Sequence, residues 1–344
     1  MGWWRVSADT LAESRFVLSA LAETTASLIV LHHATATHPG EREWLATHRA
    51  AYAERLADDP VTASLVRAAL RPRWIADLFS CPPADEDEPA LDAVARIREI
   101  PAEAVYADLA VALGAPLPAP LRRPDLPDRA ADLLEWVWTE TVRPYWSRRR
   151  RILEADIVAR TAKLAQGGWA EALDGMRPGM RWLGKGRLQI NGYDYPPREI
   201  AGSQLLFVPV TPGQGWTAWD VPHQHRYALV YPCSGVLAEE RAPVPETLGA
   251  LLGPARAAVL VLLATPKSTT QLVALTGQGL GSVGRHLKIL LDAGLVHRRR
   301  AGRSVLYSWT PAAQVLVEAQ PPGPAPARLV SPAPGRLPGR PGTR

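Results

Sequence analysis

A cluster of polar and basic side chains near the C-terminus has the residue types and spacing of a nucleic-acid-binding surface. Ser282, Arg285, His286 and Lys288 occur within a segment whose apolar residues recur at helical spacing. Hydroxyl, imidazole, guanidinium and ammonium groups donate hydrogen bonds to base edges and phosphates. A run of arginines follows shortly afterwards: Arg298, Arg299, Arg300 and Arg303. We predict that both sets contact double-stranded DNA.

The first set requires a helix that buries its opposite side. The spacing predicts a helix over 280–292 that is closed by Gly294 at its C′ position. Its predicted apolar face consists of Leu280, Val283, Leu287 and Leu290. Such a helix fits the major groove, which is ~12 Å wide, and is predicted to read base edges.

Two further helices are predicted before it. One begins at Pro254 and ends near Thr265, and the next is opened by Ser268, because Ser268-x-x-Gln271 matches a capping box. The turn Gly277-Gln278-Gly279 would join this second helix to the helix over 280–292. We include the start of the second helix and the turn in the predicted DNA contacts: Ser268, Thr269 and Gln278.

The arginine run is predicted to lie on a β-hairpin. Residues 296–307 contain two stretches suited to strands, with Ala301-Gly302 as the turn between them. Arginines on such a wing would contact phosphate or the minor groove, adding affinity but little sequence information. Helix, turn, helix and wing follow one another in the order of a winged helix-turn-helix.

These residues resemble a known family. The stretches 268–272 and 282–296, followed by Val305-Leu306-Tyr307, are similar to the winged helix of ArsR-type regulators. The N-terminal stretch 9–16 and the segment Leu229–Pro232 resemble long actinobacterial members with an extra N-terminal domain. The resemblance implies a homodimeric transcription regulator, more often a repressor. Its two reading helices would lie about 34–36 Å apart on an inverted repeat of double-stranded DNA.

Two departures from that family carry consequences. The thiolate ligands of its metal-sensing members would fall near Ser268 and Thr270, and neither is cysteine. We therefore expect no metal and no cofactor. Gly279, Gly281 and Gly284 crowd the reading helix, and each interior glycine costs ~1 kcal/mol relative to alanine.

Composition places the basic surface on one part of the chain. Residues 248–310 contain eight basic side chains and one acidic side chain, whereas residues 1–247 are net acidic, although the whole chain of 344 residues is +5. An acidic body joined to a basic segment predicts that only the basic segment meets a polyanion. Cys81 and Cys233 are too few for a disulfide framework. With neither a signal peptide nor an apolar span evident, a cytoplasmic location is expected.

The predicted fold class is α+β. A mainly helical N-terminal regulatory or dimerisation domain, 1–240, would be helical over 1–168 and would add a small antiparallel sheet over 180–235. The winged helix-turn-helix would occupy 246–312, and the Pro/Gly-rich residues 320–344 are predicted to be disordered. The strands of the sheet are predicted at 181–183, 187–190, 204–210, 217–221 and 226–231.

Other functions remain open at this point. The N-terminal domain could bind an unknown small-molecule effector or be enzymatic, although the chain shows no phosphate loop, nucleophile elbow or metal-hydrolase motif, and no catalytic residue is predicted. Alternatively, the winged helix could be a protein-interaction adaptor. The pairs His32-His33 and His223-x-His225 are interpreted as ordinary histidines, and Arg148–Arg151 as a solvated or intersubunit cluster.

Overall fold

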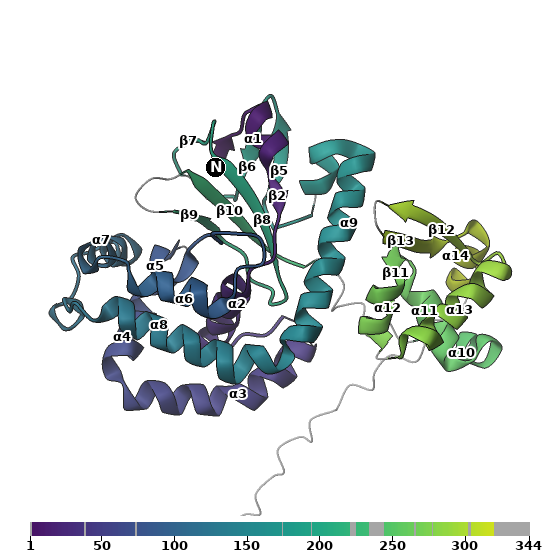
Figure 1. Cartoon of the computed structure of the whole chain (residues 1–344), viewed down its shortest axis with the longest axis horizontal. Coiled ribbons are helices and arrows are strands. Elements are labelled where there is room, and N and C mark those ends of the chain that lie inside the picture. The colour runs from purple at the N-terminus through teal and green to yellow at the C-terminus, as the bar shows by residue number, and fades with distance from the viewer. Residues whose placement is uncertain are drawn as a thin grey trace, which may run out of the picture.

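The structure is a computed structural model that describes residues 2–37, 39–72, 74–173, 175–193, 195–220, 225–233, 244–264, 266–276, 278–301 and 304–319. Helices, two four-stranded sheets and a two-stranded hairpin form the described N-terminal part, and a helix-rich C-terminal part lies beside the long helix α9 (Figure 1). The mixed helical and sheet architecture with a C-terminal helix-turn-helix agrees with the prediction. The predicted tail, 320–344, lies outside the described residues.

The helices of the N-terminal part surround α2, which is buried along most of its length because its residues, apart from Glu23 and the two histidines at its end, are apolar or small. Side-chain caps define several helix starts: Ser19 accepts from the Ala22 amide at α2, and Asp59 accepts from the Thr62 amide at α4. These helices are α1 (Ala8–Glu13), α2 (Ala20–His33), α3 (Pro39–Asp58), α4 (Pro60–Ala69), α5 (Asp77–Ser80), α6 (Ala90–Arg98), α7 (Ala102–Leu113), η1 (Ala119–Leu121), α8 (Leu126–Trp136) and α9 (Trp146–Leu173).

A proline and a glycine interrupt the long helical stretch from α8 to α9. Between α8 and α9 the chain passes through a π-helical segment, η2 (Val137–Val142), and a 3₁₀ turn, η3 (Arg143–Tyr145), which contains Pro144. Helix α9 breaks at Gly168, whose φ of 69° and ψ of −165° are not helical. One more turn follows the break, so the helical run extends to Leu173, beyond the predicted limit of residue 168.

The strands over 180–235 belong to two separate mixed sheets, and the prediction of one small antiparallel sheet is wrong. Strands β8 (Gln204–Val210) and β10 (Arg226–Pro232) pair in parallel along their whole length, and β9 (Thr217–Trp219) runs antiparallel to β10 at the edge. The strand positions agree with the prediction. The pairing differs because both central strands are apolar without alternation and are buried on both faces, as parallel strands usually are.

The N-terminal segment also supplies strands, which the predicted helical region 1–168 did not include. β2 (Arg15–Phe16) pairs in parallel with β8. β1 (Trp3–Arg5) lies in a second four-stranded sheet between β6 (Arg187–Gln189) and β7 (Arg198–Glu199), and β5 (Arg181–Gly184) lies at its edge. A short hairpin, β3 (Leu70–Arg71) and β4 (Trp74–Ile75), follows α4.

The central sheet divides the N-terminal core into two clusters. Alternate residues such as Leu206 and Val208 pack against the helices. The intervening residues, such as Leu205 and Phe207, pack with Trp4 of the other sheet. Both faces of β8 and β10 are therefore covered, which makes this sheet the centre of the N-terminal part.

The C-terminal part has its own apolar core. It contains α10 (Glu246–Leu252), α11 (Pro254–Leu262), β11 (Lys267–Ser268), α12 (Thr269–Thr276), α13 (Leu280–Asp292), β12 (Val296–Ala301), β13 (Ser304–Trp309) and α14 (Pro311–Glu318). The core joins residues of α11 to α14, including Leu260, Leu272 and Leu287. Helix α14, capped by Thr310, was not predicted.

Helix α9 contacts the C-terminal part at α12 and β11 (Figure 1). Lys267 in β11 is only 3% exposed, which is unusual for lysine. The N-terminal part therefore lies against one side of the helix-turn-helix. Among the described residues, no helix is long and apolar enough to cross a membrane.

Candidate nucleic-acid interface

Helix α13 has the bounds predicted for the reading helix. Val283, Leu287 and Leu290 are buried in the C-terminal core, as expected from their spacing. Leu280 is 63% exposed, so its assignment to the apolar face is wrong. It is the first residue of the helix, and the core begins one turn later, so no neighbouring element covers it.

Three predicted contact residues form a hydrogen-bonded row on the opposite side of α13. The Ser282 hydroxyl lies 3.1 Å from Oε1 of Gln278, to which it donates, and 3.3 Å from Nε2 of His286. Because these residues are spaced by four, they lie on one face of the helix and its preceding turn. The structure thus brings Gln278, Ser282 and His286 together.

His286 lies in a partly apolar and positively charged environment. Burial, the Arg256 guanidinium and the Arg285 guanidinium, in that order, hold the pKa of His286 below its ordinary value of 6.5. Arg256 comes from α11, where it donates to the carbonyl of Leu252. The sequence did not indicate a role for Arg256 at this surface, because its proximity to His286 depends on the packing of α11.

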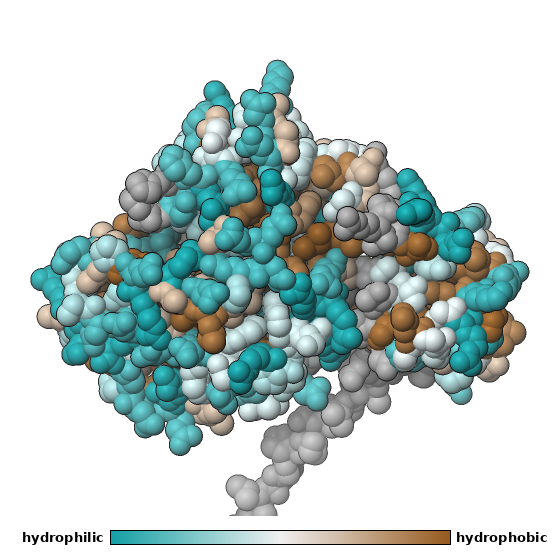
Figure 2. Space-filling model, viewed as in Figure 1, coloured by the Kyte–Doolittle hydropathy of each residue, from teal (hydrophilic) through white to brown (hydrophobic). Residues whose placement is uncertain are grey.

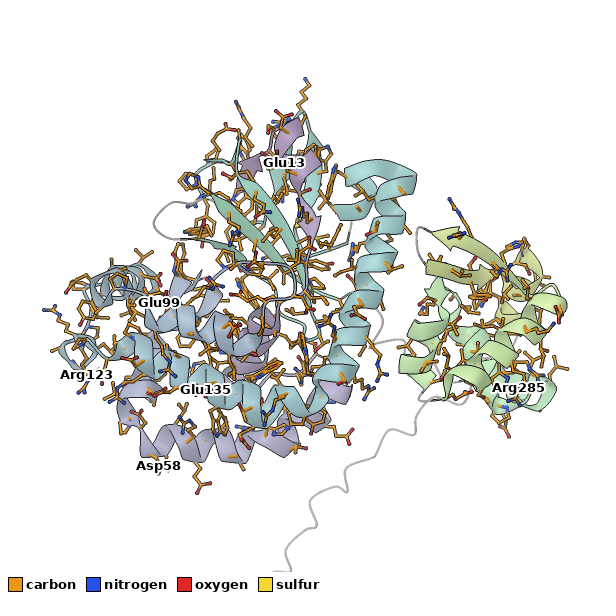
Figure 3. The ribbon with its side chains drawn as sticks, viewed as in Figure 1. Glu13, Asp58, Glu99, Arg123, Glu135 and Arg285 are labelled. Atoms are coloured by element: carbon orange, nitrogen blue, oxygen red, sulfur yellow. The ribbon has the colours of Figure 1, made fainter. Side chains whose placement is uncertain are left out.

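The two long basic side chains of α13 differ in their surroundings. Arg285 is exposed at the outer edge of the C-terminal part, on the side away from α9 (Figure 3). Lys288 donates to Asp292 one turn later at 3.1 Å, with both side chains largely exposed. Exposed pairs of this kind contribute little stability, so Lys288 remains able to exchange its partner for a phosphate.

The glycines of the reading helix have free space around them. A Cβ atom built on Gly279, Gly281 or Gly284 would meet no atom within 4 Å. Gly279 provides the N-cap of α13 without any side-chain cap. Neither packing nor backbone conformation therefore demands glycine at 281 or 284, and each lowers helix stability.

The arginine run lies on a β-hairpin, as predicted. β12 and β13 pair antiparallel, with Arg298 opposite Tyr307 and Arg300 opposite Val305. Arg298, Arg299 and Arg300 are all exposed. Since side chains alternate along a strand, Arg298 and Arg300 share one face and Arg299 occupies the other.

The hairpin strands end at Ala301 and resume at Ser304. Both Ala301 and Ser304 are in strands, so the predicted turn at Ala301-Gly302 begins one residue too early. The antiparallel pairing of β12 and β13 continues to Ala301 and Ser304, one residue further than the sequence pattern suggested. Arg303 lies outside the described residues.

The start of α12 is less open than the face of α13. Ser268 belongs to β11 and pairs with Leu306 of β13, while Thr269 is the first residue of α12. Both are partly buried, and both elements contact α9. The structure therefore links Ser268 and Thr269 to the hairpin on one side and to the N-terminal part on the other.

The histidines outside this interface do not gather with other ligand-type residues. Among the described residues, no group of three or more His, Cys, Asp or Glu could hold a metal ion. Burial, His33 and Arg67 lower the pKa of His32 to about 4, and its Nδ1 lies 3.5 Å from the Tyr52 hydroxyl. His223 of the second pair lies outside the described residues.

Comparisons with known proteins agree with this arrangement. The family model for bacterial regulatory proteins of the arsR family matches residues 253–298, which span α11 to the first half of β12. The chain is also 37% identical over 91 residues to the HTH-type transcriptional regulator NmtR of Mycobacterium tuberculosis, an alignment that covers 26% of this chain and 76% of that protein. No solved structure matches the chain. This chain belongs to the arsR family of bacterial regulatory proteins.

Proposed function

We propose that this arsR-family protein is a transcription regulator that binds double-stranded DNA, with α13 in the major groove and the β12–β13 hairpin on the backbone. One observation carries the proposal. Within the segment that matches the family, α13 buries one face in the core and presents Ser282, Arg285 and His286 on the other. A helix with this division can enter a groove without losing its packing.

The contacts have different proposed roles. Ser282, Arg285 and His286 read base edges, and Lys288 contacts a phosphate near the end of α13. Arg298, Arg299, Arg300 and Arg303 anchor the wing, and Ser268, Thr269 and Gln278 position the helix pair. Contacts to phosphate govern affinity and its salt dependence, whereas contacts to bases govern specificity.

The proposed assembly is a homodimer on an inverted repeat, and the proposed outcome is repression by occlusion of the promoter. Leu251 of α10 and Val315 of α14 are 64% and 67% exposed. Figure 2 shows hydrophobic residues at the surface of the C-terminal part, where α10 and α14 lie away from α9 (Figure 1). Apolar surface of this kind favours association of two copies.

The decisive experiment is a titration of the intact protein against DNA from upstream of its own gene. Unrelated DNA serves as competitor, and two salt concentrations are used. Arg285→Ala should lose about 1–3 kcal/mol on the specific site and bind unrelated DNA as before. Arg300→Ala should weaken binding to both DNAs and reduce the salt dependence. Arg42→Ala, an exposed arginine on α3, is the matched control and should change neither.

Residues 244–319 alone, which include α14 of the C-terminal core, provide the second arm. If the intact protein fails to bind DNA but this segment binds it, contact with the N-terminal part inhibits DNA binding. If both fail to bind any DNA in a salt-dependent manner, the DNA proposal is wrong and the helix-turn-helix is an adaptor for another protein.

A further inference from the structure

The N-terminal part contains a cavity that the DNA proposal does not use. Helices α5, α6 and α7 and the end of β9 enclose about 460 Å³, which lies in the size range of pockets for small molecules. Much of its wall is apolar, including Leu78, Ile100 and Trp219. It is the described feature best suited to hold an organic molecule.

The charged groups of this wall are predominantly acidic. Asp77 and Asp108 line the cavity, and so do Glu99 and Asp220. Asp108 accepts hydrogen bonds from the Leu78 amide at 3.3 Å and from Nε1 of Trp74 at 3.5 Å. These are neutral donors, so the carboxylate of Asp108 is oriented but its charge is not balanced.

Two arginines lie near these carboxylates, and one of them, Arg198, acts on Asp77 through its charge. Arg96 lines the cavity, but both its Nε and Nη2 donate to Glu88 at 2.8 Å. The Arg198 guanidinium stacks over the Trp219 ring, with 4.0 Å between Cζ and the ring centroid. Among the described residues, neither Asp77 nor Asp108 forms an ion pair with any of these arginines. The cavity therefore offers a surplus of carboxylate to whatever occupies it.

We propose that this cavity binds a small organic cation, an amine carried on an apolar body. The ammonium group would lie between Asp77 and Asp108, and the body would pack against Ile100, Val105 and Trp219. A neutral apolar molecule would leave both carboxylates uncompensated, and an organic anion would be repelled by them. Glu99, exposed beside α6, would add attraction near the entrance (Figure 3).

The protonation of Asp77 gives this site a characteristic pH dependence. Burial, followed by repulsion from Asp108, raises the pKa of Asp77 to about 7, and the Arg198 charge only partly opposes this. Burial also raises the pKa of Asp108, and the partly buried Cys81 adjoins both carboxylates, with its pKa raised to about 12. A bound ammonium would favour ionised Asp77. Binding near pH 6 would then release a proton, and affinity would rise between pH 6 and pH 8.

The test uses the intact protein without DNA, so its result is independent of the DNA proposal. The probe is 2-phenylethylammonium, compared with neutral 2-phenylethanol and anionic 3-phenylpropanoate. Binding is measured by calorimetry and by the fluorescence of tryptophan, since Trp219 lines the cavity and Trp74 lies 6.0 Å from it between ring centroids. The amine should bind at least about tenfold more tightly than the alcohol, and the anion should bind least.

Substitutions distinguish the carboxylates from the cavity itself. Asp77→Asn and Asp108→Asn should each weaken amine binding about tenfold while leaving the alcohol unchanged, and Asp77→Asn should remove most of the pH dependence. Ala104→Phe, which fills the cavity, should weaken both ligands. Asp92→Asn, an exposed carboxylate of α6 that does not line the cavity, should change neither. The inference is overturned if the amine does not saturate the protein, if the anion binds as well as the amine, or if folded Asp77→Asn and Asp108→Asn bind the amine unchanged.

Discussion

The hydroxyl of Ser282 and Nε2 of His286 lie 3.3 Å apart, one turn from each other on α13. The same hydroxyl donates its proton to Gln278, so toward His286 it acts as an acceptor. This arrangement requires a hydrogen on Nε2. Nδ1 is then a buried nitrogen that has no hydrogen-bond partner among the described residues.

The first prediction concerns pH. The pKa of His286 is below its ordinary value of 6.5, so the ring is neutral at pH 7.5 and gains a charge only below pH 6.5. Because a cation there would approach DNA phosphates, binding should tighten by a few-fold, up to about tenfold, between pH 7.5 and pH 5.5. DNA titrations at the two pH values measure this, and His286→Gln is expected to show a flatter response. An equal gain in His286→Gln would assign the effect to another group.

The same shift has a consequence for stability. Unfolded histidine binds a proton more readily than folded His286, so lowering the pH through 6.5 should destabilise the fold around α13. His286→Gln should reduce that loss. Acid should therefore increase the affinity for DNA but lower the free energy of unfolding. The free energy of unfolding must be measured at each pH used for the DNA titrations.

A second prediction uses the glycines of α13. Gly281→Ala and Gly284→Ala should each raise the free energy of unfolding by about 0.5–1 kcal/mol, because the added methyl group meets no neighbour and the helix gains propensity. Hydrogen exchange of the α13 amides is the direct measurement. Gly294→Ala provides a matched control of opposite sign, since its φ of +69° disfavours a side chain. Slower exchange in Gly294→Ala would contradict this reasoning.

A third prediction tests the proposed dimer. Leu251→Glu and Val315→Glu each place a charge on the exposed apolar surface of α10 and α14, so the sedimentation coefficient should shift toward that of a monomer. Leu91→Glu, which is 50% exposed on α6 of the N-terminal part, is the control and should leave assembly unchanged. If Leu91→Glu alone dissociates the assembly, the dimer forms through the N-terminal part.

A fourth prediction concerns the stability of the N-terminal part. The pKa of folded Asp77 is about 7, against an ordinary value of 3.8, so the folded protein binds this proton more tightly than the unfolded chain. The free energy of unfolding should therefore fall as pH rises from about 4 to 7. Asp77→Asn should be more stable than the natural protein at pH 8, by about 1–3 kcal/mol, and nearly equal to it at pH 4.5. Denaturant unfolding at the two pH values, with Asp92→Asn as the control, checks this.

Local patterns predicted individual helices and strands well. The bounds of α13 and the strand positions at 204–210 follow from spacing and flanking glycines alone. Leu280 was misassigned because periodicity identifies a helix face but not where the neighbouring core ends. The spacing of Gln278, Ser282 and His286 is consistent with one face of the helix and its preceding turn. The position of Arg256 beside them depends on the packing of α11, which the sequence does not show.

Long-range pairing could not be predicted in the same way. The partners of β1 and β2 lie far along the chain, and their short strands have no pattern that selects β6 or β8. One signal was available for the central sheet: the unbroken apolar runs of β8 and β10 indicate burial on both faces and hence a parallel pair. For Arg149 the expectation of a solvated or intersubunit role is wrong, because it pairs with fully buried Glu23 at 2.9 Å.

The pairing of Phe16 with Phe207 has a consequence for biosynthesis. Strand β2 cannot pair until β8 has been synthesised. The sheet is complete only after β10, which lies between β8 and β9 and ends at residue 232, has left the ribosome. Until then the early helices expose apolar surface that the nascent chain cannot cover, a situation that favours aggregation and chaperone capture. The C-terminal helices rely on nearby contacts and should fold quickly once they emerge. Truncation before β10 should therefore abolish the N-terminal fold, even though most of its residues would already be present.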